Sequence, residues 1–95
     1  KNGIYKEYHK NGVLKKLCNY IDDMINGIYK EYYMNGMVKI ICTYKDNKKN
    51  GRYKSYWEIN GQLQTSYKYT DDIFDGVCIE YNMYGKLNYI YNPSI

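Results

Sequence analysis

The sequence predicts an all-β protein, a single-layer antiparallel β-meander built from about four β-hairpin repeats of ~24 residues. The first observation is an Asn-Gly or Asp-Gly pair that recurs with this period, and the second is a further glycine in the middle of each period. The third is an aromatic content of 18%, with 15 Tyr and one Pro, which favours strands over helix or disorder. A unit this small cannot bury its apolar face alone, so the repeats must stack on one another. The structural repeat positions are Gly3, Gly27, Gly51, Gly76, Gly12, Gly36, Gly61, Gly85, Tyr20, Tyr44 and Tyr69.

Turn residues divide the chain into eight expected strands. Asn-Gly pairs at 11–12, 35–36 and 60–61 favour type I′ two-residue turns. Pairs of Asp and Asn at 22–23, 46–47 and 71–72 tolerate left-handed backbone geometry and form the next turns, and a last turn is expected at 84–85. The expected strands are 1–10, 13–21, 24–34, 37–45, 48–59, 62–70, 73–83 and 86–92.

These turns fix a register in which large and small residues oppose each other. Tyr5 lies opposite Cys18 in the first repeat, and the second repeat has the same pair as Tyr29 and Cys42. In the last repeat Cys78 lies opposite Tyr91, so the members exchange strands while the total volume is kept.

The same register gives the repeated glycines a role. Tyr20 lies opposite Gly3, so its ring can rest on bare backbone, and Tyr44 lies opposite Gly27 in the same way. The third repeat has one extra residue, and a bulge between Gly51 and Asn60 would bring Tyr69 opposite Gly51.

Alternation along each strand sorts the side chains into two faces. The apolar face is the expected core, with the tyrosines of the repeat positions as its spine, and the opposite face is edged with lysine. The expected core residues are Tyr5, Leu14, Cys18, Tyr20, Ile25, Tyr29, Tyr33, Val38, Ile40, Cys42, Tyr44, Tyr53, Trp57, Leu63, Tyr67, Tyr69, Phe74, Cys78, Leu87 and Tyr91.

The length of 95 residues fits a single domain, residues 1–95, with hairpin repeats at approximately 3–26, 27–50, 51–75 and 76–95. The chain starts inside a repeat without Met, so we expect a fragment of a longer array. Pro93 stands where the other repeats have tyrosine, and it should remove a hydrogen-bond donor from the last edge strand, as expected at the end of an array. Net charge is +4, which permits an anionic partner.

The three cysteines are expected to be free thiols. Cys18 and Cys42 lie two strands apart, so their backbones are roughly 9 to 10 Å apart, whereas a disulfide needs Cα atoms within about 7 Å. Buried free thiols are typical of a reducing compartment.

No residue pattern points to catalysis. The single histidine, His9, is expected opposite Leu14 and lacks other residues at metal-ligand spacing. Glu7 is expected opposite Lys16 in a surface ion pair, and no glutamate has a second acid at catalytic spacing. The sequence predicts a non-enzyme with no cofactor, no metal and no small-molecule substrate.

The repeat resembles a known family. Gly3 is followed by Tyr5, Tyr8 and Asn11-Gly12, and Tyr20 stands seven residues before the next repeat glycine. This spacing resembles MORN-type repeats, in the Asn-, Lys- and Tyr-rich variants of antitoxin-like and giant-virus proteins. The chain lacks the closely spaced Gly-x-Gly of the family and has Tyr where many members have Trp. The resemblance implies stacked hairpins and a role in scaffolding or in membrane and phosphoinositide recognition.

Three functions follow from these observations. The favoured one is a scaffold or protein–protein interaction module, with a protein partner or self-association as a homodimer or longer array. The alternatives are a binder of anionic lipid, or less favourably of nucleic acid, and an antitoxin-like inhibitor. The expected location is intracellular and cytoplasmic, at a membrane surface if lipid is bound. The expected interaction face carries Lys6, Tyr8, Lys15, Lys30, Tyr32, Lys39, Lys54 and Tyr56.

Overall fold

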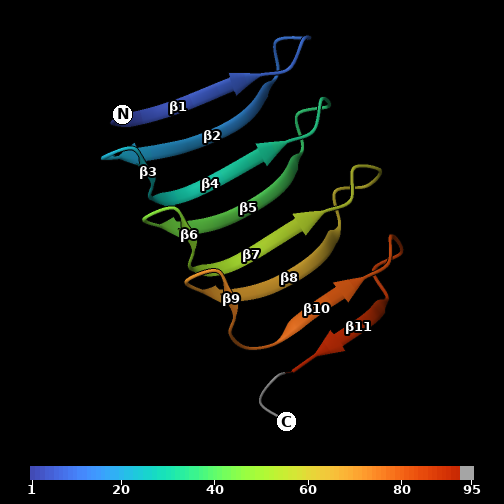
Figure 1. Ribbon diagram of the computed structural model, residues 1–95. Coiled ribbons are helices and arrows are strands. Elements are labelled where there is room, and N and C mark those ends of the chain that lie inside the picture. The colour runs from blue at the N-terminus through green and yellow to red at the C-terminus, as the bar shows by residue number, and fades with distance from the viewer. Residues whose placement is uncertain (93–95) are drawn as a thin grey trace.

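The computed structural model describes residues 1–92, and these residues form one open antiparallel sheet without a helix (Figure 1). The Cα positions extend over 41 × 31 × 12 Å, and all the described strands belong to one hydrogen-bonded sheet, so the predicted single layer is confirmed. The main strands follow the order β1-β2-β4-β5-β7-β8-β10-β11. The strands are β1 Gly3–Tyr8, β2 Leu14–Ile21, β3 Met24–Ile25, β4 Gly27–Tyr32, β5 Val38–Lys45, β6 Lys48–Lys49, β7 Gly51–Tyr56, β8 Leu63–Thr70, β9 Ile73–Phe74, β10 Cys78–Tyr81 and β11 Leu87–Tyr91.

Three of the expected strands, 24–34, 48–59 and 73–83, are each split in two. The segment 24–34 begins as β3, which folds back on the end of β2, and continues as β4 in the next hairpin. Gly27, the first residue of β4, has φ 87°, a left-handed value that interrupts strand geometry. The turn before β3 has positive φ at both Asp22 and Asp23, as a type I′ turn requires, so the aspartate turns were predicted correctly.

The Asn-Gly turns differ from the prediction of type I′. Only Gly12 has positive φ, and its N–H donates to the carbonyl of His9 at 3.0 Å. The loop therefore has three residues, a type I turn closed by a left-handed glycine. Asn11 contributes through its side chain, whose Oδ1 accepts from the N–H of Val13. His9 consequently pairs with Val13 and not with Leu14 as expected.

The extra residue of the third repeat lies in its loop. The N–H of Gly61 donates to the carbonyl of Trp57 at 2.8 Å, which closes a turn one residue longer than in the other hairpins. The register shift between Ser55 and Tyr56 is common to all four hairpins, so the extra residue does not cause it.

This shift is a β-bulge that changes which residues share a face. Glu7 pairs with Lys16, but Tyr8 pairs with Leu14, which leaves Lys15 as the additional residue. Two residues of β2, Lys15 and Lys16, thus oppose the single residue Glu7 of β1, and both side chains point to the same face as Glu7. The same shift leaves Lys39 in the second hairpin as the extra residue.

Away from the bulge the predicted register is confirmed, including Tyr5 opposite Cys18 and Gly51 opposite Tyr69. The expected role of the glycines is wrong, however. A Cβ built at Gly3 or Gly27 would meet nothing within 4 Å, so no ring rests there. The glycines are needed because of their positive φ.

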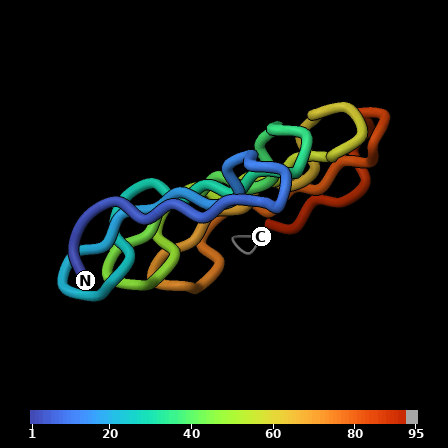
Figure 2. The backbone as a smooth tube through the Cα atoms, turned by 90° about the horizontal axis from the view of Figure 1, so that it is seen from above, coloured from blue at the N-terminus to red at the C-terminus, as the bar shows by residue number. Residues whose placement is uncertain are grey.

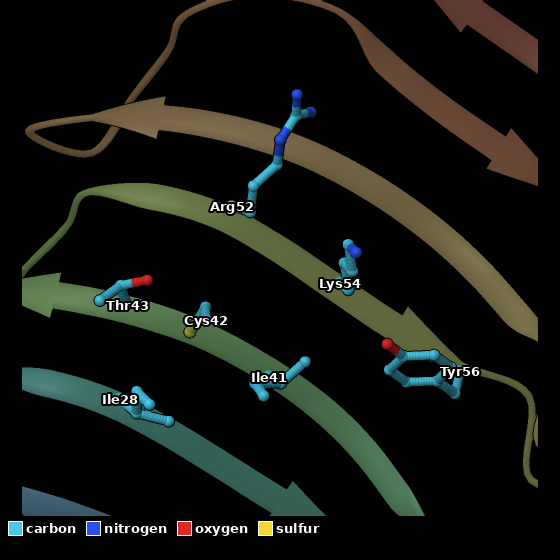
Figure 3. Close-up of a pocket in the computed structure, with 7 residues that line it drawn as sticks. All are labelled: Ile28, Ile41, Cys42, Thr43, Arg52, Lys54 and Tyr56. Atoms are coloured by element: carbon cyan, nitrogen blue, oxygen red, sulfur yellow. The ribbon is translucent and has the colours of Figure 1, made fainter.

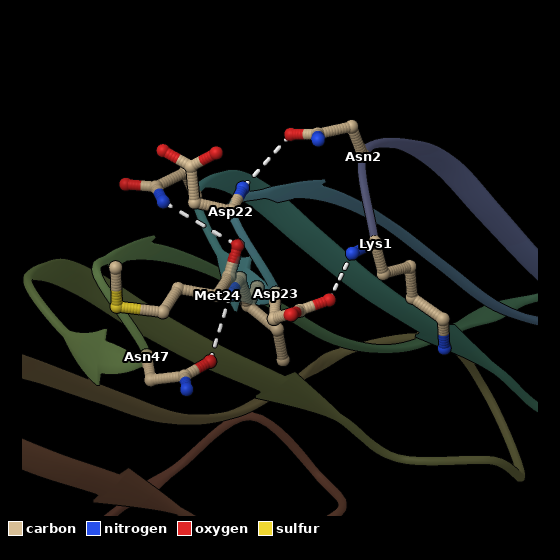
Figure 4. A network of polar contacts seen from close by, with 8 residues as sticks. Lys1, Asn2, Asp22, Asp23, Met24 and Asn47 are labelled. Carbon is tan, nitrogen blue, oxygen red and sulfur yellow. Dashed lines mark hydrogen bonds and ion pairs between the residues drawn. The ribbon is translucent and has the colours of Figure 1, made fainter.

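Neighbouring repeats are joined at their turns (Figure 4). The N–H of Asp22 donates to Asn2 Oδ1 at 2.8 Å, and the N–H of Ile25 donates to Asn47 Oδ1 at 2.7 Å. The N–H of Asn47 in turn donates to the carbonyl of Ile25 at 3.0 Å. Each aspartate turn therefore holds the preceding repeat, and β2 and β4 need to share only a short ladder.

Replacing Asn47 separates the contribution of its side-chain hydrogen bond from that of its left-handed backbone conformation. Asn47→Ala removes the side-chain acceptor and places alanine at φ 69°, so we expect a loss of about 2 kcal/mol in the free energy of unfolding. Asn47→Gly removes the acceptor alone and should cost less than about 1 kcal/mol. Urea unfolding followed by circular dichroism measures both. Equal losses would show that the backbone at this position is not strained.

The core is smaller than predicted. Among residues 1–92, the buried apolar residues are Cys18, Tyr29, Cys42 and Cys78. Other expected members are half-buried, and Phe74, Leu87 and Tyr91 are about half exposed, at 50%, 56% and 48%. One layer of sheet has no second layer to cover it. Pro93 lies outside the described residues.

All three cysteines are buried free thiols, as predicted. We expect the same mass for the protein with and without a reductant. We also expect slow alkylation of all three in native protein and rapid alkylation in denaturant. Fast alkylation of the native protein would contradict the burial of Cys18, Cys42 and Cys78.

Candidate interaction faces

The sheet exposes two faces along its length. Seen from above, its strands overlap in a thin band with turns at both ends (Figure 2). We name the two faces by the side chains that dominate them and assign residues from register and alternation. The tyrosine face comprises Tyr5, Glu7, Lys15, Lys16, Cys18, Tyr20, Ile25, Tyr29, Glu31, Lys39, Ile40, Cys42, Tyr44, Lys49, Tyr53, Ser55, Gln64, Thr65, Tyr67, Tyr69, Phe74, Cys78, Glu80, Tyr89 and Tyr91. The lysine face comprises Ile4, Lys6, Tyr8, Leu14, Leu17, Asn19, Ile28, Lys30, Tyr32, Val38, Ile41, Thr43, Arg52, Lys54, Tyr56, Leu63, Ser66, Lys68, Ile79, Tyr81, Leu87 and Ile90.

Six of the eight predicted interaction residues share the lysine face, namely Lys6, Tyr8, Lys30, Tyr32, Lys54 and Tyr56. The bulge turns the other two away. Lys15 Nζ lies 3.4 Å from Glu7 Oε2, and Lys39 Nζ lies 5.8 Å from the centre of the Tyr33 ring. Conversely, the expected core residues Leu14, Val38, Leu63 and Leu87 lie opposite tyrosines of the lysine face.

The cations of the tyrosine face are engaged within the molecule. Lys16 Nζ lies 5.9 Å and 5.3 Å from the ring centres of Tyr5 and Tyr29. Lys49 Nζ lies 5.2 Å and 5.0 Å from the ring centres of Tyr53 and Tyr69, as Lys1 Nζ does at 4.9 Å and 4.6 Å from those of Tyr5 and Tyr20. Cation–π contacts and neighbouring carboxylates balance these charges.

Tyrosine–glutamate pairs lie on the same face. Tyr5 donates to Glu7 Oε1 at 2.9 Å, and Tyr29 donates to Glu31 Oε2 at 2.5 Å. The hydrogen bond from Tyr5, assisted by Lys15, lowers the pKa of Glu7. The expected partner Lys16 lies opposite Glu7, but the ion pair forms with the bulged Lys15.

The buried thiols and phenols of this face predict loss of stability at alkaline pH. Burial raises the pKa of Cys42 from 9.0 to about 11 and that of Tyr44 from 10.0 to about 12. Because these groups ionise at lower pH in the unfolded chain, burying their neutral forms stabilises the folded state fully below pH 9. This stabilisation is lost as pH rises through the folded-state pKa values. The urea midpoint should therefore fall above pH 9. A midpoint that rose there would contradict the burial of these groups.

The lysine face differs because its cations have no internal partners. Within residues 1–92, no ion pair or hydrogen bond engages the side chains of Lys6, Lys30 or Lys54. Of the ten Asp and Glu side chains, Glu7, Glu31 and Glu80 lie on the tyrosine face, and the other seven belong to turns or connections. The lysine face is therefore an uncompensated positive surface.

Two adjoining hollows lie on this face. One has a volume of ≈ 370 Å³ and is lined by Ile4, Leu17, Asn19, Asn26, Gly27, Ile28 and Lys30 and by Cys18. The other, of ≈ 310 Å³, is lined by Ile28, Ile41, Thr43, Arg52, Lys54 and Tyr56 and by Cys42 (Figure 3). Both have mainly apolar linings, and Ile28 belongs to both. Sequence alternation identified the lysines but not these hollows, which depend on how the strands curve.

The described residues offer no arrangement typical of a metal site, since no group of three or more His, Cys, Asp or Glu residues is placed to hold an ion there. His9 contacts the next hairpin instead, with Nε2 2.8 Å from the carbonyl oxygen of Tyr32. Residues 1–92 contain no helix, and hence no helix of the length and hydrophobicity that crosses a bilayer.

A family model described as a MORN repeat variant matches residues 1–22 and 25–46. These segments are the first two repeats, and the third and fourth hairpins continue their architecture and register. No curated protein and no solved structure matches the chain significantly.

The matches identify residues 1–22 and 25–46 as MORN-type repeats and support a MORN-type repeat protein. MORN repeats typically form scaffolds or interaction modules and are generally not catalytic.

Proposed function

We propose that the protein is a non-catalytic scaffold that binds a protein partner on an open face of its sheet. The observation that carries this proposal is the lysine face, which combines unpaired cations with exposed aliphatic groups. Ile4 and Ile28 on this face are 72% and 59% exposed. Apolar groups gathered beside uncompensated charge are typical of an interaction surface.

The lysine face suits this role better than the tyrosine face. On the tyrosine face the lysines contact aromatic rings or a carboxylate, and Tyr29 is buried. A partner there would have to disrupt these contacts. On the lysine face a partner would add contacts without removing any.

A pull-down from the source cells tests the proposal. The wild-type chain, a Lys6→Glu/Lys30→Glu variant and a Lys10→Glu/Lys86→Glu control should be compared by mass spectrometry. The control makes the same charge change at exposed residues in two turns. We expect proteins captured by the wild type and the control that the lysine-face variant loses. Equal capture by all three chains would contradict a role for this face.

Sedimentation across a concentration series separates partner binding from self-association. A homodimer or longer array formed through the lysine face would lose mass in the Lys6→Glu/Lys30→Glu variant alone. Anionic lipid and nucleic acid remain alternative ligands for the same charges, and an inhibitor role would appear as capture of a single toxin-like protein.

A further inference from the structure

We infer that the lysine face binds an acidic amphipathic helix, which lies across the strands from β1 to β7. This inference rests on the proposed function and specifies its partner. It follows from the order of the side chains in one row of the lysine face that runs across the strands.

That row alternates cations with aliphatic groups. Cross-strand pairing places Lys6, Leu17, Lys30, Ile41 and Lys54 next to one another on five adjacent strands. Leu17 and Ile41 are half-buried, and the stems of Lys30 and Lys54 are partly covered as well. The lysine heads are therefore free to face solvent above an aliphatic floor.

The spacing of this row matches a helix. Neighbouring strands are about 4.8 Å apart, so successive lysines are about 9.6 Å apart with an aliphatic group halfway. Seven residues of helix span about 10.5 Å, with a side chain on the same face about halfway along. Carboxylates at every seventh position would reach the lysines, and apolar residues between them would meet Leu17 and Ile41.

Other peptide conformations fit less well. Same-side residues of an extended strand repeat at about 6.6 Å, which matches neither spacing. A polyproline helix repeats at about 9.3 Å but has no side chain on that side at the halfway point.

The surface also favours a helix over lipid or nucleic acid. A flat bilayer would meet the long lysine side chains first and leave the hollows around Ile28 uncovered. Single-stranded nucleic acid needs aromatic rings for stacking. Tyr8 and Tyr32 line neither hollow, and Tyr56 is the one aromatic ring in linings that are otherwise mainly aliphatic and basic, so the hollows lack a row of rings for stacked bases.

The test uses a designed peptide of three heptads, about 21 residues, labelled with a fluorophore and measured by anisotropy. Glutamate occupies one position of each heptad, and leucine occupies the positions three and four residues later. A scrambled peptide of the same composition, in which these residues share no face, is the control. We expect the patterned peptide to bind at least about tenfold more tightly than the scrambled one, because only it can pair with both sets of groups.

Matched variants locate the binding site. Lys30→Glu should weaken binding about tenfold, whereas Lys86→Glu in an exposed turn should change it less than about twofold. Ile28→Ser should weaken binding about fivefold, and Ile59→Ser, 73% exposed in a loop, should leave it unchanged. Unchanged circular dichroism of each variant excludes misfolding.

Equal binding of the two peptides, or equal effects of Lys30→Glu and Lys86→Glu, would overturn the inference. So would Lys30-dependent binding of phosphatidylserine vesicles or of oligothymidylate that the patterned peptide does not displace. If the peptide fails but the pull-down still shows partners that depend on the lysine face, the proposed function stands and only the acidic helix is rejected.

Discussion

Replacing Tyr29 by alanine should destabilise the protein by about 3–5 kcal/mol, a large share of the stability of a small domain. Tyr29 is 8% exposed and packs with Cys18 and Cys42. Its ring centre lies 5.3 Å from that of Tyr44. A single-layer sheet has no other layer to fill the space left behind. Urea unfolding followed by far-UV circular dichroism measures the loss.

Two further variants make this result specific. Tyr84→Ala removes the same side chain from a turn where it is 80% exposed, and it should cost less than about 0.5 kcal/mol. Tyr29→Phe keeps the ring but loses the hydrogen bond to Glu31, so about 1 kcal/mol is expected. Similar losses for Tyr29→Ala and Tyr84→Ala would show that this cluster is not the core.

The second large effect is expected at a connection between repeats. Gly51→Val should cost about 3 kcal/mol, because Gly51 has φ 118°, a conformation that side chains with a Cβ rarely adopt. In addition, a Cβ there would lie 3.1 Å from Thr43 Oγ1. The thermal unfolding midpoint should fall accordingly.

Arg52→Val is the matched control for this change. It places the same side chain one residue later, at an exposed strand position, and should be close to neutral. Adding Thr43→Ala to Gly51→Val should recover only the part of the lost stability that comes from the close contact with Thr43 Oγ1. Full recovery would mean that the contact, and not the backbone conformation, made glycine necessary.

Most of the fold could be predicted from the sequence because the repeat supplies independent copies of one pattern. The pairing of Gly3 with Tyr20 and of Cys78 with Tyr91 follows from turn positions alone. The bulge could not be predicted in this way. A two-residue turn at Asn11-Gly12 gives the same pairs near Cys18 as a three-residue turn followed by a bulge. The two arrangements differ only at residues close to the turn.

This difference matters for the candidate site. Simple alternation places Lys15 with Lys6, whereas the bulge places it with Glu7 on the tyrosine face. It also moves Leu14 to the lysine face, beside Tyr8. The extent of burial was overestimated for a related reason, because alternation identifies a face but not what covers it.

The assignment of residues to faces is the central claim, since the proposed binding surface depends on it. NMR measurement of cross-strand contacts between backbone protons tests it most directly. We expect Tyr8 to contact Leu14, Tyr32 to contact Val38 and Tyr56 to contact Leu63. Contacts of Tyr8 with Lys15 and of His9 with Leu14 would instead show an unbulged hairpin, and would place Lys15 and Lys39 back among the lysines of the other face.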